Sequence, residues 1–568
     1  MLVHLQNQRS LSSDHSKLGL GGDFLPTTMD DATRRGWSEL DVVMVTGDAY
    51  VDHPAFGPIL IARLLAKRGL RVAVLAQPDW RSVADFRRFG RPKLFFGVSA
   101  GNVDSMLNRL TAQKQNRSSD PYSPGGRPGQ RPDRATLVYA NRCREAFPDV
   151  PIILGGIEAS LRRIAHYDYW SDSVRRPILV DAKADLLVFG MGESPILEIS
   201  ERLQHGEAID RIRDVRGTAL LLSQEETLAL SAPRELSPEC RPIVELPAYE
   251  EVVGGDLESR QRFALMSRQS HEESNRQNGR PLLQRVGHRA VYFNPPALPL
   301  TEEQLDALYD LPFTRRAHPS YREPVPAYEV VKHSLRLLRG CASDCSFCCV
   351  SEHEGRIVQR RSTESIEREL TALQQLDDFH GGTLDRCVTE PSFAAEQAKS
   401  GLSPLPAYIS GHPGSTLDYT IELALYLKAH HLRPPSVQDF IPTPMSLATA
   451  MYYTGLDPLS KDASHPVFTE RGLRDKKLQR ALLMYWDRSQ HDLAREALHK
   501  ANRRDLIGHG PGCLVPPAHS PRHDRSLNVS TGRGPRTPVR HGSLDHAPKR
   551  PASRPLPTSP EDAPQPLT

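Results

Sequence analysis

Strand-like and helix-like segments alternate over residues 40–189, and this alternation constrains the fold more than any other feature of the chain. The apolar run 41–46 ends at Gly47, and the helical stretch 58–68 separates it from the next strand-like run, 71–75. Strands that alternate with helices at this spacing predict an α/β fold with a Rossmann-like, doubly wound parallel sheet. Further strand candidates are residues 93–98, 150–154 and 185–189.

Polar side chains gather where these predicted strands end. Ligands of doubly wound sheets lie beyond the carboxyl ends of the strands, so these side chains are candidate ligand contacts. Two alternatives stay open: Asp52 caps the next helix while His53 is an ordinary loop residue, and the glutamates face solvent. The candidates are Asp48, Tyr50, Asp52 and His53 after the first strand, and Glu158 and Glu193 after glycine turns.

A cysteine cluster follows a short strand-like run at residues 334–339. Four of the eight cysteines lie within residues 341–349, and Cys341, Cys345 and Cys348 have the spacing CxxxCxxC. Three thiolates can hold three corners of a [4Fe-4S] cluster and leave the fourth iron open to a small molecule. A structural zinc site is the alternative, and it needs a fourth ligand. The fourth-ligand candidates are His353 and Cys387, because Cys349 directly follows Cys348.

Composition excludes several classes of protein. Lys and Arg number 72 against 69 Asp and Glu, so no overall positive field favours nucleic acid as a partner. The N-terminus lacks a continuous apolar segment, and no run approaches the roughly 18 apolar residues of a membrane helix. Clustered cysteines are typical of a reducing compartment. We therefore expect a cytoplasmic protein without a membrane partner.

The cysteine loop resembles the cluster loop of radical S-adenosylmethionine (SAM) enzymes, in which an aromatic residue at the position of Phe347 lies against the adenine. Many segments over residues 23–515 resemble, in the same order, the YgiQ family of uncharacterised radical SAM proteins. They include VTGDAYVDHPAFG (45–57), LFFGVSAGNVDSM (94–106), ILGGIEASLRRIAHYDYWSDSVRR (153–176), NPPALPLT (294–301), SEHEGRIVQRRS (351–362) and VQDFIPTPMSLATAMYYTGLDPL (437–459).

The resemblance implies a radical SAM core behind the N-terminal α/β domain. Cys341, Cys345 and Cys348 would hold the cluster, SAM would bind its open iron, and a reductase or flavodoxin-type donor would supply the electron. The resulting 5'-deoxyadenosyl radical would abstract hydrogen from an unknown substrate. The N-terminal domain also resembles cobalamin domains of other radical SAM enzymes, but it lacks their DxHxxG signature, which disfavours cobalamin.

Other motifs carry weaker predictions. His412 and Gly414 would face the SAM pocket of an intact barrel, although His412-Pro413-Gly414 also suits a plain turn before a helix. Gly381 and Gly382 imitate a SAM-binding glycine motif. Arginine pairs can grip phosphate, but they are more often solvated or ion-paired. These pairs are Arg162 and Arg163, Arg175 and Arg176, and Arg360 and Arg361.

The predicted core is too short for a complete radical SAM barrel. Six βα units at about 30 residues each need roughly 180 residues, whereas the barrel-like segments span only residues 334–456. We expect the middle strands to be missing near residues 379–406. The expected divisions are an N-terminal extension (1–35), a Rossmann-like domain (36–230), a connecting region (231–330), a radical SAM core (331–513) and a disordered, proline-rich tail (514–568).

Two hypotheses for function follow. In the first hypothesis, the chain is a radical SAM enzyme, and whether it still catalyses the reaction with its shortened core is left open. The alternative is a non-catalytic α/β protein that binds a ligand or partner and has a vestigial cluster site or a zinc site in the cysteine loop.

Overall fold

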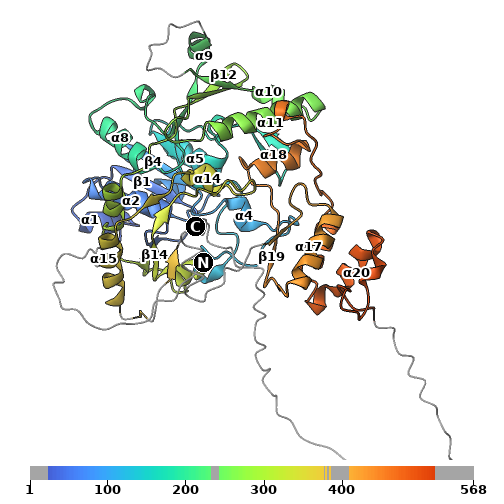
Figure 1. Ribbon diagram of the computed structural model, residues 1–568. Helices are drawn as coiled ribbons and strands as arrows, with labels where there is room; N and C mark the ends of the chain where they lie inside the picture. Colours follow the sequence, from blue (N-terminus) through green and yellow to red (C-terminus); the bar gives the residue numbers. More distant parts are fainter. Residues whose placement is uncertain (1–22, 232–241, 377, 380–382, 386–407, 519–568) are drawn as a thin grey trace, which may run out of the picture.

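The computed structural model describes residues 23–231, 242–376, 378–379, 383–385 and 408–518. Its centre is a nine-stranded sheet, whose first five strands run parallel in the order β3-β1-β4-β5-β8 (Figure 1). The predicted α/β fold with a doubly wound parallel sheet is thus confirmed. The five strands are β1 (Val42–Thr46), β3 (Val72–Ala76), β4 (Phe95–Ser99), β5 (Ile152–Leu154) and β8 (Leu186–Val188).

Helices cover both faces of this sheet because each central strand is apolar on both sides. Val43 and Val45 of β1 pack into the same core cluster as α5 (Ala135–Ala146). Val42 and Met44 pack on the other side with residues of α2 (Gly57–Lys67) and α8 (Glu193–Gln204). A near-continuous apolar run is typical of a strand buried on both faces, which is why the apolar runs located these strands.

The segment expected as a connecting region extends the same sheet. Three of its strands join β9 (Thr218–Leu222) in the order β9-β12-β11-β10, and β8, β9, β12 and β11 pair antiparallel in turn. The helix α11 (Leu257–Glu272) lies between β10 and β11 in sequence. The exact domain limits stay a prediction, but residues 244–293 form part of the N-terminal sheet. The added strands are β10 (Val244–Leu246), β11 (Leu282–Val286) and β12 (Arg289–Phe293).

The later part of the chain forms short strand pairs within the residues described. β14 (Ser334–Arg336) pairs parallel with β17 (Thr383–Asp385), and β18 (Tyr408–Ser410) pairs parallel with β19 (Val437–Asp439). β15 (Leu338–Arg339) and β16 (Gln359–Arg360) pair antiparallel. In the described segments these pairs do not join into one barrel sheet, in accord with a shortened barrel.

Two sequence predictions fall largely outside the described residues. β17 lies within the stretch from which strands were expected to be missing, and residues 386–407 of that stretch are not described. Of the predicted tail, Leu514 and Val515 are buried with α17 (Leu417–Ala429), α19 (Leu473–Leu483) and α20 (His491–Lys500), whereas residues 519–568 are not described. Within the described part, none of the helices is both long and apolar enough to cross a bilayer.

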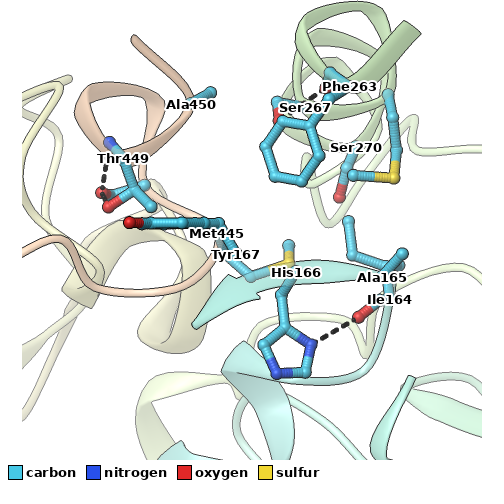
Figure 2. A pocket seen from close by; sticks show the side chains of 12 residues that line it. Ile164, Ala165, His166, Tyr167, Phe263, Ser267, Ser270, Met445, Thr449 and Ala450 are labelled. Carbon is cyan, nitrogen blue, oxygen red and sulfur yellow. Dashed lines mark hydrogen bonds between the residues drawn. The ribbon is translucent and has the colours of Figure 1, made fainter. Parts of the chain in front are cut away.

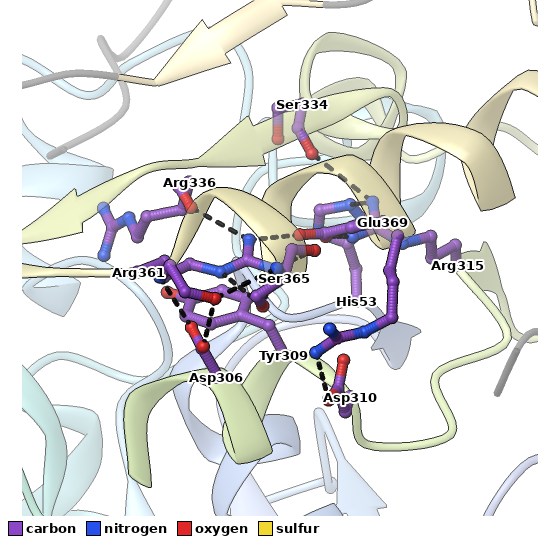
Figure 3. A network of polar contacts seen from close by, with 12 residues as sticks. His53, Asp306, Tyr309, Asp310, Arg315, Ser334, Arg336, Arg361, Ser365 and Glu369 are labelled. Atoms are coloured by element: carbon purple, nitrogen blue, oxygen red, sulfur yellow. Dashed lines mark hydrogen bonds and ion pairs between the residues drawn. The ribbon is translucent and has the colours of Figure 1, made fainter. Parts of the chain in front are cut away.

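Buried charges join the N-terminal sheet to the later part of the chain (Figure 3). Glu369 on α15 (Thr363–Gln374) forms ion pairs with both Arg315 and Arg361. Arg315 also lies 3.1 Å from His53 Nε2 and donates to the Ser334 carbonyl oxygen at 3.3 Å. All three charged residues are less than one-tenth exposed, so the carboxylate of Glu369 balances two guanidinium groups in a low-dielectric environment.

Replacing Glu369 should destabilise this junction strongly. Glu369→Gln leaves Arg315 and Arg361 buried without their carboxylate, so we expect a loss of about 3–5 kcal/mol in the free energy of unfolding. Denaturant unfolding followed by circular dichroism measures it. The control is Glu367→Gln, an exposed position on the same helix, for which we expect a change of at most about 0.5 kcal/mol. Equal stability of the two variants would contradict the buried triad.

Candidate functional site

The cysteine loop is closed by its own backbone. β15 leads into Gly340, and α14 (Val350–Glu354) follows the last cysteine. The Cys341 N–H donates to the Gly355 carbonyl at 3.1 Å, and the Cys348 N–H donates to that of Cys345 at 3.0 Å. Gly340 has a φ of +83°, and a Cβ there would lie 2.3 Å from the Ile357 carbonyl oxygen. Only glycine therefore allows the sharp entry into the loop.

The three predicted ligands all lie at least partly at the surface, whereas Cys349, the fourth cysteine of the loop, is buried. Cys345 is exposed, whereas Cys341 and Cys348 are half-buried. Burial, followed by the neighbouring Cys341, raises the pKa of the Cys345 thiol, and the Cys348 pKa is raised by burial and by both other cysteines. Cys349 instead packs against Ile157 and Leu161, and burial raises its pKa to about 12. Cys349 is a core residue, as its position next to Cys348 predicted.

The described residues near the loop do not form a ready-made site for a single metal ion. Among the described residues, no three or more His, Cys, Asp or Glu side chains are grouped to hold one ion. Two residues were candidates for a fourth zinc ligand. The Nδ1 atom of His353 lies 3.0 Å from Ser160 Oγ, and Cys387 lies outside the described residues. In an iron-sulfur cluster each cysteine binds a different iron, so its thiolates stand further apart than the ligands of one ion.

Phe347 and His412 meet beside the cysteines although they are far apart in sequence. Their rings stand edge to face with centroids 6.0 Å apart, and Phe347 is 41% exposed. His412 Nδ1 lies 2.7 Å from the Pro413 carbonyl oxygen, and Nε2 lies 3.3 Å from Ser346 Oγ. Burial lowers the His412 pKa, so the neutral ring donates through Nδ1 and accepts at Nε2.

Gly414 lies on the same turn with a different set of contacts. Its φ is +89°, and its N–H donates to the Phe468 carbonyl at 2.7 Å. The turn before α17 that was the alternative interpretation of His412-Pro413-Gly414 is therefore present, and it also brings His412 to the cysteine loop. Gly381 and Gly382 lie outside the described residues.

Glu193 connects the N-terminal sheet to the cysteine loop. It follows β8 at the carboxyl edge of the sheet and forms a buried ion pair with Arg339, the residue before Gly340. Arg339 Nε also donates to Tyr309 Oη at 3.1 Å. Glu193 therefore does not face solvent, and its Oε1 is occupied by Arg339 and not free to bind a ligand. Its role is to position the start of the cysteine loop.

The polar residues after β1 are buried and paired within the protein. Asp52 accepts from Arg63 Nε at 2.8 Å and from the Thr314 N–H at 2.9 Å. Tyr50 Oη accepts from the Leu25 N–H at 2.9 Å. The suggestion that Asp52 caps the next helix is wrong, because the N-cap of α2 is Phe56.

Asp48 and His53 are equally enclosed. Asp48 lies 3.1 Å from Arg131 Nη1 and accepts from the Asn102 N–H at 2.7 Å, and burial raises its pKa to about 6. His53 accepts from the Ala55 N–H at 3.1 Å, and burial lowers its pKa well below the usual value. The strand-end rule located a polar cluster here, but the cluster is tied to the protein itself.

Glu158 joins two helices through their first turns. One carboxylate oxygen accepts from the Ser105 N–H at 2.8 Å, and the other accepts from the Thr136 N–H at 2.9 Å. These residues open α4 (Ser105–Arg109) and α5, whose first N–H groups have no partners within the helix. The alternative that Glu158 faces solvent is wrong, since it is 1% exposed.

Several residues that hold the cysteine loop carried no recognisable sequence signal. His271 on α11 lies 2.9 Å from Glu352 Oε1, and Arg356 Nε donates to Asp344 Oδ1 at 3.2 Å. The arginine pairs noted from the sequence are mostly engaged within the protein. Arg162 pairs with Asp104, Arg163 Nη1 donates to the Ser160 carbonyl at 2.8 Å, Arg175 and Arg176 pair with Asp168 and Asp181, and Arg361 pairs with Glu369.

A small enclosed pocket lies behind this region, between α11, β6 (His166–Asp168) and α18 (Leu447–Thr454) (Figure 2). His166 Nδ1 lies 3.0 Å from the Ile164 carbonyl oxygen, while its Nε2 has no hydrogen-bond partner among the described residues. Burial lowers the His166 pKa to about 3, so the ring is neutral. The pocket places polar atoms at the junction of the two parts of the chain.

Removing the Glu158 carboxylate should test its structural role. Glu158→Ala deprives two buried N–H groups of acceptors, each worth about 1–3 kcal/mol, so we expect a total loss of about 2–6 kcal/mol in unfolding free energy. Glu158→Gln keeps one acceptor oxygen and should lose about half as much. Denaturant titration compares the two. Wild-type stability in both variants would contradict this role and restore Glu158 as a ligand candidate.

Two parts of the chain match known protein families. Residues 24–334, more than half of the chain, match the family described as Radical SAM N-terminal. Residues 435–559 match a domain of unknown function, DUF3362. Among solved structures, the radical SAM methyltransferase TsrM from Kitasatospora setae with tryptophan and a SAM analogue aligns at 14% identity and a TM-score of 0.33, covering 78% of this chain and 65% of that one. That similarity is too low to support an argument.

Curated relatives match nearly the whole chain. UPF0313 protein RPA0679 of Rhodopseudomonas palustris is 39% identical over 645 residues, covering 91% of this chain and 94% of the relative. UPF0313 protein YgiQ of Salmonella typhimurium is 37% identical over 653 residues, covering 87% and 90%. Both aligned lengths exceed the 568 residues of this chain, so the relatives contain residues within the aligned region that this chain lacks. The chain therefore belongs to the UPF0313 family that includes YgiQ, with a radical SAM N-terminal domain.

Proposed function

We propose that this protein binds a [4Fe-4S] cluster through Cys341, Cys345 and Cys348, and SAM beside it, as a radical SAM enzyme of unknown substrate. The observation that carries the proposal is the loop on which burial and neighbouring cysteines raise the pKa values of Cys345 and Cys348, with Phe347 and His412 next to them. Membership of a family with a radical SAM N-terminal domain supports it. When bound and reduced, such a cluster supplies the electron that cleaves SAM to methionine and a 5'-deoxyadenosyl radical.

The chain's own residues would orient SAM and the loop. Phe347 offers an exposed ring on which the adenine can stack. His412 keeps a neutral ring beside it and fixes the Ser346 hydroxyl. Glu193 holds Arg339, so the start of the loop is fixed to the sheet. These contacts would limit the motion of the reactive groups, which is the protein's part in cofactor chemistry.

The proposal includes a reducing environment and an external electron source. The three thiols must lose their protons to bind iron, and the raised pKa values of Cys345 and Cys348 make the loss of their protons depend on the metal. Cys345 is exposed, which leaves the loop open to a reductase or flavodoxin-type donor. We propose a cytoplasmic location on this ground. Cobalamin is not part of the proposal, because His53 is buried, 1% exposed, and held by Ala55 and Arg315.

A second candidate function follows from the shortened core. In the described residues β14 and β17 do not join β18 and β19 in one sheet, and the relatives contain residues that this chain lacks. A protein without a continuous barrel can keep the cluster loop and lose turnover. The alternative is a non-catalytic α/β protein that binds a ligand or partner.

Anaerobic reconstitution with iron and sulfide separates the candidates. We expect wild type to take up one [4Fe-4S] cluster, with an EPR signal that changes on adding SAM, and to form 5'-deoxyadenosine after reduction. Alanine at Cys341, Cys345 or Cys348 should abolish the SAM-sensitive signal, because each removes one of three ligands. Cys349→Ala is the matched control and should retain it. A SAM-sensitive cluster without 5'-deoxyadenosine would favour the non-catalytic protein, and a signal unaffected by the three substitutions would refute the cluster site.

Phe347→Ala should weaken SAM binding without removing the cluster. Loss of a base-stacking ring costs about 1–3 kcal/mol, so we expect SAM affinity to fall by roughly 5- to 150-fold while iron and sulfide contents stay at wild-type levels. Titration of the EPR change with SAM measures the affinity. Phe468→Ala, another half-exposed ring, serves as the control. Unchanged affinity in Phe347→Ala would show that the ring does not contact the adenine.

A further inference from the structure

A buried lysine lies on α19 without a carboxylate partner. Lys476 is 1% exposed, and its Nζ lies 4.6 Å from the ring centroid of Tyr452, 5.4 Å from that of Tyr169 and 3.5 Å from Tyr452 Oη. Among the described residues none of the carboxylates forms an ion pair with it. Tyrosine faces attract an ammonium group, but burying a charge without a counterion is costly. The site therefore lacks one negative charge.

Other cations surround the same two rings. Lys114 Nζ lies 4.6 Å from the Tyr169 centroid, and Arg471 Cζ lies 5.6 Å from that of Tyr452. The Arg471 guanidinium donates to the Tyr452 and Tyr453 carbonyl oxygens at 3.0 and 2.8 Å. Within the described segments, neither cation has a carboxylate ion-pair partner. Three positive groups thus converge on Tyr169 and Tyr452.

The nearby carboxylates do not neutralise this group. Burial lowers the Lys476 pKa to about 8, although Asp439 and Glu470 act to raise it. Asp439 is already engaged, since it accepts from Ser410 Oγ at 2.7 Å and lies 3.7 Å from Arg480 Nη1. Near neutral pH the amine therefore carries a charge that its surroundings only partly balance.

The lysine is linked to the cysteine loop through packed side chains. Gly411 has a φ of +69°, and a Cβ there would lie 3.1 Å from Lys476 Cγ, so the absence of a side chain lets the lysine stem pass. The next residue, His412, meets the cysteine loop and contacts Phe440 with centroids 5.4 Å apart. Phe440 in turn lies 6.0 Å from Tyr452. Gly411 on one route, and Phe440 with Tyr452 on the other, thus connect Lys476 to His412.

We propose that Lys476, framed by Tyr169 and Tyr452, binds an anionic group, a carboxylate or a phosphate, of the molecule on which the protein acts. A bound anion supplies the missing charge, and Lys114 and Arg471 add to its attraction. Assigning that anion to the substrate rests on the proposed function, whereas anion binding itself requires neither the cluster nor SAM.

Thermal unfolding of the full chain without cluster tests the site. Inorganic phosphate and acetate are titrated separately against sodium chloride of equal ionic strength, because a ligand that binds the folded state raises the unfolding temperature. We expect at least one anion to raise it in wild type and in Lys477→Met, an exposed neighbour. In Lys476→Met we expect the affinity for that anion to fall at least tenfold. Lys476→Arg keeps the positive charge and should retain part of the rise in unfolding temperature. The anion that raises the unfolding temperature more shows whether the site prefers a phosphate or a carboxylate group.

Binding by wild type at different pH gives a second measurement that needs no variant. Acetate affinity should fall as the pH rises from 7 to 9.5, because Lys476 loses its proton near 8. The other charged groups facing it are Asp439, Glu470, Lys114 and Arg471, and burial raises the pKa of Tyr169 and Tyr452, which stay neutral. If phosphate is the effective anion, the same measurement is made with phosphate instead of acetate, between pH 8 and 9.5, where the charge of phosphate changes little.

Three results would overturn the proposal: no effect of either anion on wild type, an equal effect on Lys476→Met, or an affinity that does not change with pH. None of these depends on 5'-deoxyadenosine formation. If the proposed enzyme function fails, the anion-binding measurement can still be interpreted. If the anion site is missing, the cluster and SAM measurements are unaffected.

Discussion

The ion pair between Glu193 and Arg339 is the interaction on which the candidate site depends. Glu193 belongs to the carboxyl edge of the N-terminal sheet, and Arg339 immediately precedes the glycine that opens the cysteine loop. A buried pair gains little net free energy over a well-packed apolar contact, but it fixes one geometry, because either charge left alone in the interior is costly. The position of the thiols is thus set by a residue of a different part of the fold.

The same principle recurs through the molecule. Glu369 balances Arg315 and Arg361, Asp52 balances Arg63, and each charge is buried. Lys476 differs because its charge lacks an ion-pair partner within the described residues. The anion proposed to bind there would supply that partner from outside the protein.

The sequence predicted features whose causes are local. The strands β1, β3 and β4 followed from apolar runs between turns, and the spacing of the cysteines supplied the candidate cluster ligands, which stay a prediction. It could not predict contacts between distant residues: Thr314 bonds to Asp52 across 262 positions, and Arg339 pairs with Glu193 across 146. Asp52, Glu158 and Glu193 had the composition and placement of ligand contacts, and only the folded chain shows that they bind the protein itself. The strands 244–293 were missed as part of the sheet because their partners lie earlier in the chain.

The antiparallel extension of the sheet has a consequence for the order of assembly during synthesis. A ribosome releases the chain from its N-terminus, and domains generally fold as units in that order. The last strand of the nine, β12, ends at Phe293, ahead of Cys341. The whole sheet that carries Glu193 can therefore be in place before Cys341, the first cysteine of the loop, is translated. The thiols then emerge next to a finished surface, and the loop can dock on Glu193 and the other residues of that surface rather than fold together with them.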